Sequence, residues 1–263
     1  ERVWREYAGE REIHNAILSY LDIRPQNFYR VEADVDGLKF ITARGWEDMS
    51  SLMYVYEELG ISINAGVVGE FLHNEDIAED FGAYYDLYNK YRDDYGINNI
   101  LMGNAAPDIY RRMVEADYDE RLTVVNLLLD TLNKHFKYAA SLKADTDNWY
   151  KSIKDKIKAG EDAAAIDKEK AEFAAQAARL ESVEKQTLAK LENAFDFLEG
   201  SKQEISREDI GKLDQEMLIF VTGLTTGKES SSFLLVNPCD RYKSYSAMYL
   251  KGGRRNQLLK EME

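Results

Sequence analysis

Residues 119–160 read DERLTVVNLLLDTLNKHFKYAASLKADTDNWYKSIKDKIKAG, and this stretch decides the fold. Its apolar residues alternate three and four positions apart, which is the spacing of one buried stripe on a long α-helix. The stripe consists of Leu122, Val125, Leu129, Leu132, Phe136 and Ala139, and it resumes after a phase shift at Leu142, Trp149, Ile153 and Ile157. The spacing predicts one helix of about forty residues that ends at Gly160.

A second apolar stripe follows Gly160. It consists of Phe173, Ala177, Leu180, Leu191, Ala194 and Leu198, and is interrupted by Glu184 and Thr187. Two stripes of similar length on either side of a glycine predict an antiparallel hairpin of long helices over residues 119–199. Trp149 would then lie near the tip, either exposed as a contact site or buried in the seam. The alternative is a set of shorter helices in one compact bundle.

The N-terminal half predicts helices around one small β-hairpin. A helix is expected over residues 10–21, because apolar residues recur there at helical spacing and Pro25 follows. Residues 28–32 and 38–42 predict two short strands around Asp36-Gly37, a dipeptide suited to a tight turn. This is the only convincing β signal, so the chain is predicted to be all-α with one small β-hairpin.

Three further helices are expected before the long ones. The first begins near Gly45 and ends at Gly60, a residue suited to a left-handed cap. The second covers residues 65–72, and Asn74 caps the third. The third carries tyrosines at helical spacing, which we interpret as packing residues and not as a ligand-binding cluster: Tyr84, Tyr85, Tyr88 and Tyr91.

A domain boundary is predicted between Gly96 and Pro107. This segment is rich in turn-forming residues and has no helical period. We therefore expect a helical domain with the β-hairpin over residues 1–103 and a long-helical appendage over residues 104–263.

Composition and charge exclude several classes of protein. The 263 residues carry a formal net charge of −14, which disfavours nucleic-acid binding because phosphate contacts need clustered lysine and arginine. A single cysteine, Cys239, leaves no internal disulfide, and no segment resembles a signal peptide or a membrane span. We expect a cytoplasmic protein that binds neither nucleic acid nor membrane.

Several short motifs resemble known sites but fail on spacing. Residues 222–229 read TGLTTGKE, in which the glycines are one position too close for a P-loop and Glu229 stands where a magnesium-binding hydroxyl belongs. Residues 34–37 and 145–148 each match only part of a calcium loop. The histidines belong to no paired ligand motif, and no metal site is predicted: His14, His73 and His135.

One segment carries a more specific pattern. Residues 40–50 read FITARGWEDMS and lead into the helix expected up to Gly60. The segment resembles the second-sensor segment of MoxR-family AAA+ ATPases, in which an arginine at the head of a lid helix reaches the bound nucleotide. Arg44 matches that arginine. A guanidinium at a helix entrance presents a fixed fork of donors suited to phosphate oxygens. The alternative is that Arg44 only pairs with Glu47 or Asp48.

The resemblance covers residues 1–103 well and the remainder more faintly. It implies an AAA+ lid-type helical bundle followed by a long helical appendage, in a bacterial, chaperone-like remodelling ATPase that uses ATP and Mg²⁺. Walker A, Walker B, the first sensor and the arginine finger are absent from this sequence. The resemblance therefore implies an α/β subdomain upstream of Glu1, neighbouring subunits of a hexameric ring, and a partner with a von Willebrand type A domain.

Two expectations concern the chain by itself. Without the Walker motifs it is expected to bind no cofactor tightly and to have no catalytic residue of its own. The rival hypothesis is a stand-alone helical scaffold or adaptor, which would bind partners through its long hairpin and its tyrosine-rich helix and would need no nucleotide.

Overall fold

The computed structural model describes residue 4 and residues 13–34, 37–203 and 210–250. Two compact units divide the chain. Unit 1 comprises residues 1–97 and 115–127, and unit 2 comprises residues 98–114 and 128–263. The domain boundary expected between residues 103 and 104 stays a prediction.

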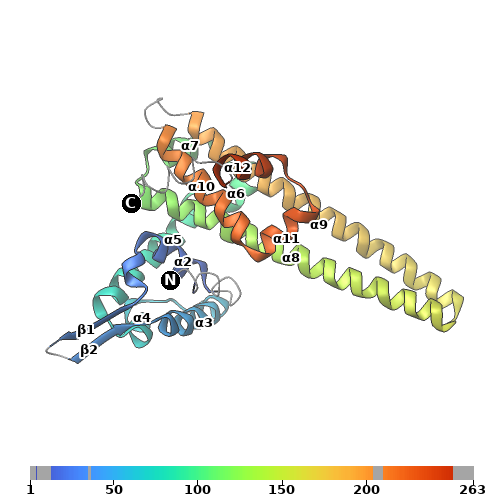
Figure 1. The fold of residues 1–263 in the computed structure, drawn as a ribbon, viewed down its shortest axis with the longest axis horizontal. Coiled ribbons are helices and arrows are strands. Elements are labelled where there is room, and N and C mark those ends of the chain that lie inside the picture. Colours follow the sequence, from blue (N-terminus) through green and yellow to red (C-terminus); the bar gives the residue numbers. More distant parts are fainter. Residues whose placement is uncertain (1–3, 5–12, 35–36, 204–209, 251–263) are drawn as a thin grey trace. The chain divides into compact units, whose positions relative to one another are not determined.

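Unit 1 is a helical bundle with one β-hairpin, as the sequence predicts (Figure 1). Its elements in chain order are α2 (Asn15–Ile23), the 3₁₀ turn η1 (Pro25–Asn27), β1 (Arg30–Asp34), β2 (Gly37–Ile41), α3 (Ala43–Leu59), α4 (Ala65–Leu72) and α5 (Glu75–Asp94). The first turns of α8 (Tyr118–Ala159) complete it. Its core includes the fully buried rings of Trp46 and Phe81, whose centroids lie 5.4 Å apart, together with Tyr20.

Polar and glycine caps set the ends of the unit 1 helices. The side chains of Thr42, Asn64 and Asn74 accept backbone N–H bonds at the starts of α3, α4 and α5. Gly60 ends α3 with φ of 66°, in the left-handed region that glycine adopts without steric cost. The predicted caps at Gly60 and Asn74 are confirmed.

The β-hairpin starts later in the chain than predicted. The strand expected at 28–32 lies at Arg30–Asp34, because the turn at Pro25–Asn27 continues into Phe28, whose φ and ψ of −66° and −43° are helical. The strands are antiparallel, with Asp34 opposite Gly37. That register leaves two residues between the strands, as a tight turn requires. The predicted turn at Asp36-Gly37 and the helix start at Glu10 fall on residues 35–36 and 5–12, which lie outside the described residues.

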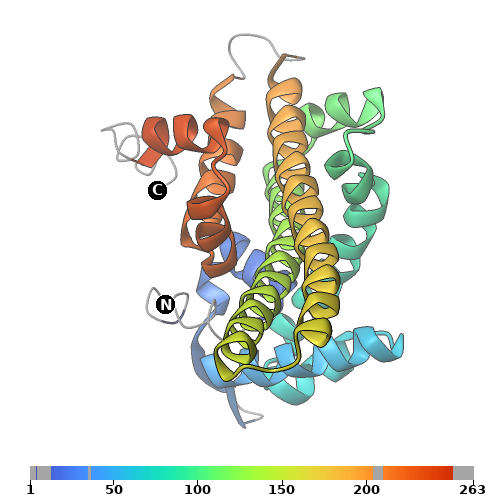
Figure 2. The same ribbon diagram turned by 90° about the vertical axis from the view of Figure 1, so that its right-hand side faces the viewer.

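Unit 2 is built on a hairpin of two long helices. Residues 128–159 of α8 run antiparallel to α9 (Ala163–Gln203), and Figures 1 and 2 both show the two side by side. Gly160 turns the chain with φ of 74°. Cross-hairpin contacts follow the antiparallel order, from Lys156 with Glu169 near the tip to His135 with Lys190 further down. The predicted hairpin of long helices is confirmed, and the alternative of shorter helices is wrong.

Shorter helices pack around the open end of this hairpin. They are α6 (Ile97–Leu101), α7 (Pro107–Glu115), α10 (Ile210–Thr226), α11 (Lys228–Val236) and α12 (Asp240–Leu250). Phe195 of α9 is a centre of this packing, since its ring lies 5.2 Å from that of Phe220 and 5.6 Å from that of Tyr245. The segment 96–107, for which no helical period was expected, contains α6. A helix of five residues is too short to show a helical period in its sequence.

Candidate functional site

Arg44 lies in the first turn of α3, as predicted. Its side chain is 77% exposed, and its Nε donates to Asp48 Oδ2 over 3.0 Å. A second ion pair joins Nη1 to Glu47 Oε2 over 3.9 Å. The local pairing that the sequence offered as an alternative is therefore present. Ion pairs of an exposed guanidinium contribute only about 0–1 kcal/mol, so they do not commit Arg44 to these carboxylates.

The backbone beneath Arg44 is held rigidly. Thr42 Oγ1 accepts the N–H of Gly45 over 3.2 Å, and this bond fixes the first turn of α3. Trp46 is fully buried, and its Nε1 donates to the carbonyl of Asn27 over 3.3 Å. A capped helix start followed at once by a buried tryptophan fixes the backbone of Arg44, while its side chain is exposed.

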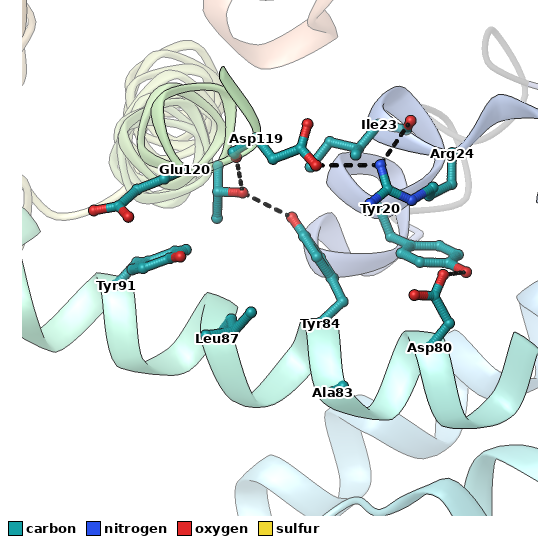
Figure 3. A pocket seen from close by; sticks show the side chains of 11 residues that line it. Tyr20, Ile23, Arg24, Asp80, Ala83, Tyr84, Leu87, Tyr91, Asp119 and Glu120 are labelled. Atoms are coloured by element: carbon teal, nitrogen blue, oxygen red, sulfur yellow. Dashed lines mark hydrogen bonds and ion pairs between the residues drawn. The ribbon is translucent and has the colours of Figure 1, made fainter. Parts of the chain in front are cut away.

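A separate pocket lies within unit 1, between α2, α5 and the start of α8 (Figure 3). Its volume is about 150 Å³. Aliphatic, aromatic and charged side chains line it: Tyr20, Ile23, Arg24, Asp80, Ala83, Tyr84, Leu87, Tyr91, Asp119, Glu120 and Thr123. Three of these are carboxylates and one is a guanidinium, so the lining carries an excess of negative charge.

Hydrogen bonds fix the deeper wall of the pocket. The hydroxyl of Tyr84 donates to Ser19 Oγ over 2.6 Å and lies 3.3 Å from Thr123 Oγ1. Burial, opposed by these two hydrogen bonds, raises the pKa of Tyr84 to about 12. Asn126 Nδ2 donates to the same Ser19 oxygen over 2.9 Å. One buried hydroxyl thereby ties together α2, α5 and α8.

Two of the lining carboxylates accept hydrogen bonds from tyrosine hydroxyls. The hydroxyl of Tyr20 donates to Asp80 Oδ2 over 2.6 Å, and the hydroxyl of Tyr95 donates to Glu120 Oε1 over 2.8 Å. Burial, with a smaller effect from the bond to Asp80, raises the pKa of Tyr20 well above its ordinary value. The phenol therefore stays neutral at physiological pH. Arg24 Nη1 pairs with Asp119 Oδ2 over 3.2 Å.

The tyrosines of α5 divide between packing and the pocket. Tyr85 and Tyr88 are 6% and 2% exposed, which agrees with the interpretation of this set as packing residues. Tyr84 and Tyr91 also line the pocket, a role that was not predicted from the sequence. Their helical spacing is the only signal that could have pointed to it, because the other walls come from distant parts of the chain.

The remaining sequence motifs lie within helices or at a helix junction. Residues 145–148 lie inside α8, and residues 222–229 form the end of α10 and the start of α11, with Gly227 as the junction. The structure does not bring the three histidines together. Among the described residues, no group of three or more His, Cys, Asp or Glu side chains is arranged to hold a metal ion.

The histidines have separate surroundings. His14 is buried and its Nε2 lies 3.2 Å from Glu57 Oε1, whereas His73 ends α4 in the left-handed conformation with φ of 41°. His135 lies in the seam of the long hairpin, where Lys190 Nζ is 3.0 Å from its Nε2.

No family model, no curated protein and no solved structure matches this chain. In the part of the chain that the structure describes, no helix is both long and apolar enough to cross a bilayer.

Proposed function

We propose that this chain is the lid and helical appendage of a MoxR-type AAA+ ATPase, and that Arg44 senses the bound nucleotide. The observation that carries the proposal is the placement of Arg44, exposed in the capped first turn of α3 next to the buried Trp46. A γ-phosphate would compete for the guanidinium against the carboxylates of Glu47 and Asp48, whose side chains are 21% and 44% exposed. Ion pairs at the protein surface are weak. Charge-assisted, two-pronged contacts with phosphate oxygens are stronger.

ATP and Mg²⁺ would be held mainly by residues outside this chain. In this proposal an α/β subdomain encoded upstream supplies the phosphate-binding loop and the magnesium ligands, and neighbouring subunits of a hexameric ring complete each site. The unit 1 pocket does not serve as the nucleotide site. Its 150 Å³ is well below the roughly 300–1,000 Å³ of pockets for drug-sized ligands, and its excess of carboxylates would repel phosphate.

The helical appendage would transmit the movement of the lid to other proteins. Nucleotide state would bias the lid, and the long helical hairpin would contact the remodelled protein or a partner with a von Willebrand type A domain in the bacterial cytoplasm. Tyr150 and Ile157 of α8 are each about half exposed near the hairpin tip and offer apolar contact area.

Two measurements test the ATPase proposal. The gene is read upstream of Glu1 for an in-frame G-x-x-x-x-G-K-[ST] loop, and the ATPase activity of the complete product is compared with that of Arg44→Ala. Arg111→Ala is the matched control, because Arg111 is an exposed arginine on α7. Loss of turnover in Arg44→Ala alone supports the proposal. A start codon immediately before Glu1, or equal turnover in both variants, overturns it.

The rival scaffold function rests on the same exposed tip residues, Tyr150 and Ile157. It requires no nucleotide and no upstream loop. A start codon immediately before Glu1, together with partner binding that is lost in a double Tyr150→Ser, Ile157→Ser variant, would favour it.

A further inference from the structure

The long hairpin extends past the shorter helices of unit 2. Helix α11 contacts it through Phe233, whose ring centroid lies 5.0 Å from that of Phe136, and through Asn237, which donates to Glu184. Beyond these contacts Figure 1 shows α8 and α9 continuing side by side to their tip, with no third described helix of unit 2 beside them. A two-helix segment buries one seam and leaves the sides of that seam exposed.

The two sides of the seam differ near the tip. Trp149 and Tyr150 both contact Phe173, with ring centroids 5.9 and 5.8 Å from it. Consecutive helix residues point about 100° apart, so these two rings flank Phe173 on opposite sides. On the first side, Glu169 accepts bonds from the indole of Trp149 and from Lys156 and closes the seam. On the second side, Tyr150 is half exposed, and its hydroxyl makes no hydrogen bond within the described ranges.

Lysines border this second side. Tyr150, Lys154 and Ile157 are four and three positions apart, so they follow one face of α8. Lys154 Nζ lies 5.2 Å from the centre of the Tyr150 ring. Lys151 and Lys158 stand three and four positions from Lys154, and both are exposed. The side therefore presents an apolar pair next to a row of ammonium groups, and we call it the lysine face.

The charge of this row is mostly unpaired. Lys158 pairs with Asp155 over 3.4 Å, and both side chains are largely exposed, so the pair is weak. Lys154 contacts the ring of Tyr150, and Lys151 forms no ion pair or hydrogen bond with any residue that the structure describes. In a chain with a net charge of −14, the lysine face is a local positive surface beside exposed apolar side chains.

We propose that the lysine face binds an acidic amphipathic helix of another protein. Tyr150 and Ile157 lie two turns apart, roughly 10 Å, which is the spacing of anchor contacts between packed helices. A third helix along the open side would cover this pair with its own apolar residues. Its glutamates or aspartates would pair with the lysines, as charged residues flank the apolar seam of a coiled coil.

The inference deepens the proposed role of the hairpin as the part that contacts other proteins, and it rests on that role. It names the chemistry of the partner. Its tests involve no ATP turnover, so a failure of the ATPase proposal and a failure of this inference give different results.

Nucleic acid and anionic membranes fit the lysine face less well. Their affinity grows with the number of phosphates or headgroups that are neutralised, and three lysines within about 10 Å supply few such contacts. An extended polyanion would also meet the repulsion of an acidic chain. Neither uses the apolar pair as a protein helix does.

Two synthetic helical peptides test the charge preference. Both carry the same leucines at the a and d positions of about three heptads, and one has glutamate where the other has lysine at e and g. The full chain is titrated with each, and binding is followed by NMR shifts of the Ile157 methyl groups. We expect the glutamate peptide to bind at least about tenfold more tightly, and to weaken as salt rises. Equal affinity for the lysine peptide, or no binding of either, overturns the proposal.

Other polyanions are tested in the same titration. The probes are vesicles of phosphatidylserine and phosphatidylcholine, and a DNA duplex of about 20 base pairs. We expect both to bind more weakly than the glutamate peptide. Binding of either probe as tight as that of the peptide overturns the proposal.

The apolar pair is tested by a double variant. Tyr150→Ser with Ile157→Ser should weaken the glutamate peptide by at least about tenfold, because these side chains supply the buried contact. Trp149 fluorescence then replaces the Ile157 signal as the readout. Leu235→Ser, at an exposed leucine on α11, is the matched control and should leave binding unchanged. Equal affinity in the double variant and the control overturns the proposal.

The lysines are tested by removal and by reversal of charge. Lys151→Gln with Lys154→Gln should weaken the glutamate peptide by about threefold to tenfold, whereas Lys243→Gln, at an exposed lysine on α12, should not. Lys151→Glu with Lys154→Glu should reverse the preference, so that the lysine peptide binds more tightly. A purely structural role for these lysines would not produce that reversal. An unchanged preference in the reversed variant, with the melting temperature of the unmodified chain, overturns the proposal.

Discussion

A β-carbon on residue 45 would lie 2.7 Å from the backbone carbonyl oxygen of Phe71, so Gly45 allows the start of α3 to approach the end of α4. No natural side chain fits there unless the two backbones move apart. Packing against Phe71 therefore requires glycine at position 45. The position of the neighbouring Arg44 depends on the same contact between α3 and α4.

We predict that Gly45→Ala destabilises the chain by about 1–3 kcal/mol, the usual cost of overpacking where the neighbour cannot yield. Chemical denaturation measures it. Gly69→Ala is the control inside α4, since its β-carbon would meet Ala78 at an ordinary 3.9 Å. That substitution should be neutral or stabilising by about 0.5–1 kcal/mol, because alanine favours a helix interior. Equal destabilisation by both would contradict the close approach.

Arg44→Ala should change the melting temperature of the chain very little. Its guanidinium is exposed, and its ion pairs to Glu47 and Asp48 are expected to contribute about 1 kcal/mol at most. In the complete ATPase the same substitution should lower turnover strongly, and Arg44→Lys should restore only part of it, because an ammonium keeps the charge and loses the planar fork. A collapsed lid with normal turnover would make Arg44 a structural residue.

The chain alone should not bind Mg²⁺–ATP with micromolar affinity. A lid contributes a single charged contact, whereas most of the binding energy comes from the phosphate loop and the metal ligands. Isothermal titration calorimetry with ATP and magnesium provides the measurement. A micromolar dissociation constant would reveal a complete nucleotide site within these residues and would end the interpretation of the chain as a lid.

Acid should loosen the hairpin seam near its tip. Glu169 accepts from Lys156 Nζ at 2.9 Å and from Trp149 Nε1 at 3.0 Å, and these bonds lower its pKa below the ordinary 4.5. Since the folded pKa is the lower one, the stabilisation is complete above 4.5 and is lost as pH falls through the folded value. The indole N–H signal of Trp149 should titrate with a midpoint below 4.5. Glu169→Gln should abolish that titration.

Stability should also fall on mild acidification because of His135. Burial, with a smaller contribution from the Lys190 ammonium, lowers its pKa below 6.5. The unfolded chain then binds the proton more readily, so stability is full above 6.5 and falls as pH drops toward the folded value. Melting temperatures between about pH 8 and pH 5 should drop less for His135→Gln than for the unmodified chain. An identical drop would exclude His135 as the cause.

The sequence predicts most of the helices because their apolar stripes are long. The hairpin expected over residues 119–199 is formed by Tyr118–Ala159 and Ala163–Gln203, and the helix expected at 65–72 has those bounds. Trp149 takes an intermediate position. It lies in the seam against Phe173, with ring centroids 5.9 Å apart, and is only partly buried.

The unit 1 pocket could not be predicted from the sequence. Tyr20, Tyr84 and Thr123 lie on three helices that are far apart in the chain, and only tertiary packing brings them together. A local sequence pattern does not show which residues of distant helices will be in contact. Arg44, in contrast, lies at the head of α3 as the resemblance implied. Thr42, which was expected to end a strand, instead caps this helix by accepting the N–H of Gly45.

The hydroxyl of Ser19 joins segments that leave the ribosome at very different times. It accepts bonds from Tyr84 and from Asn126, and residues 115–127 belong to the same compact unit as residues 1–97. A nascent chain that has reached residue 103 holds Ser19 and Tyr84 but not yet Asn126. The parts of α2 and α5 that contact the start of α8 therefore cannot be covered until residues 115–127 have been synthesised.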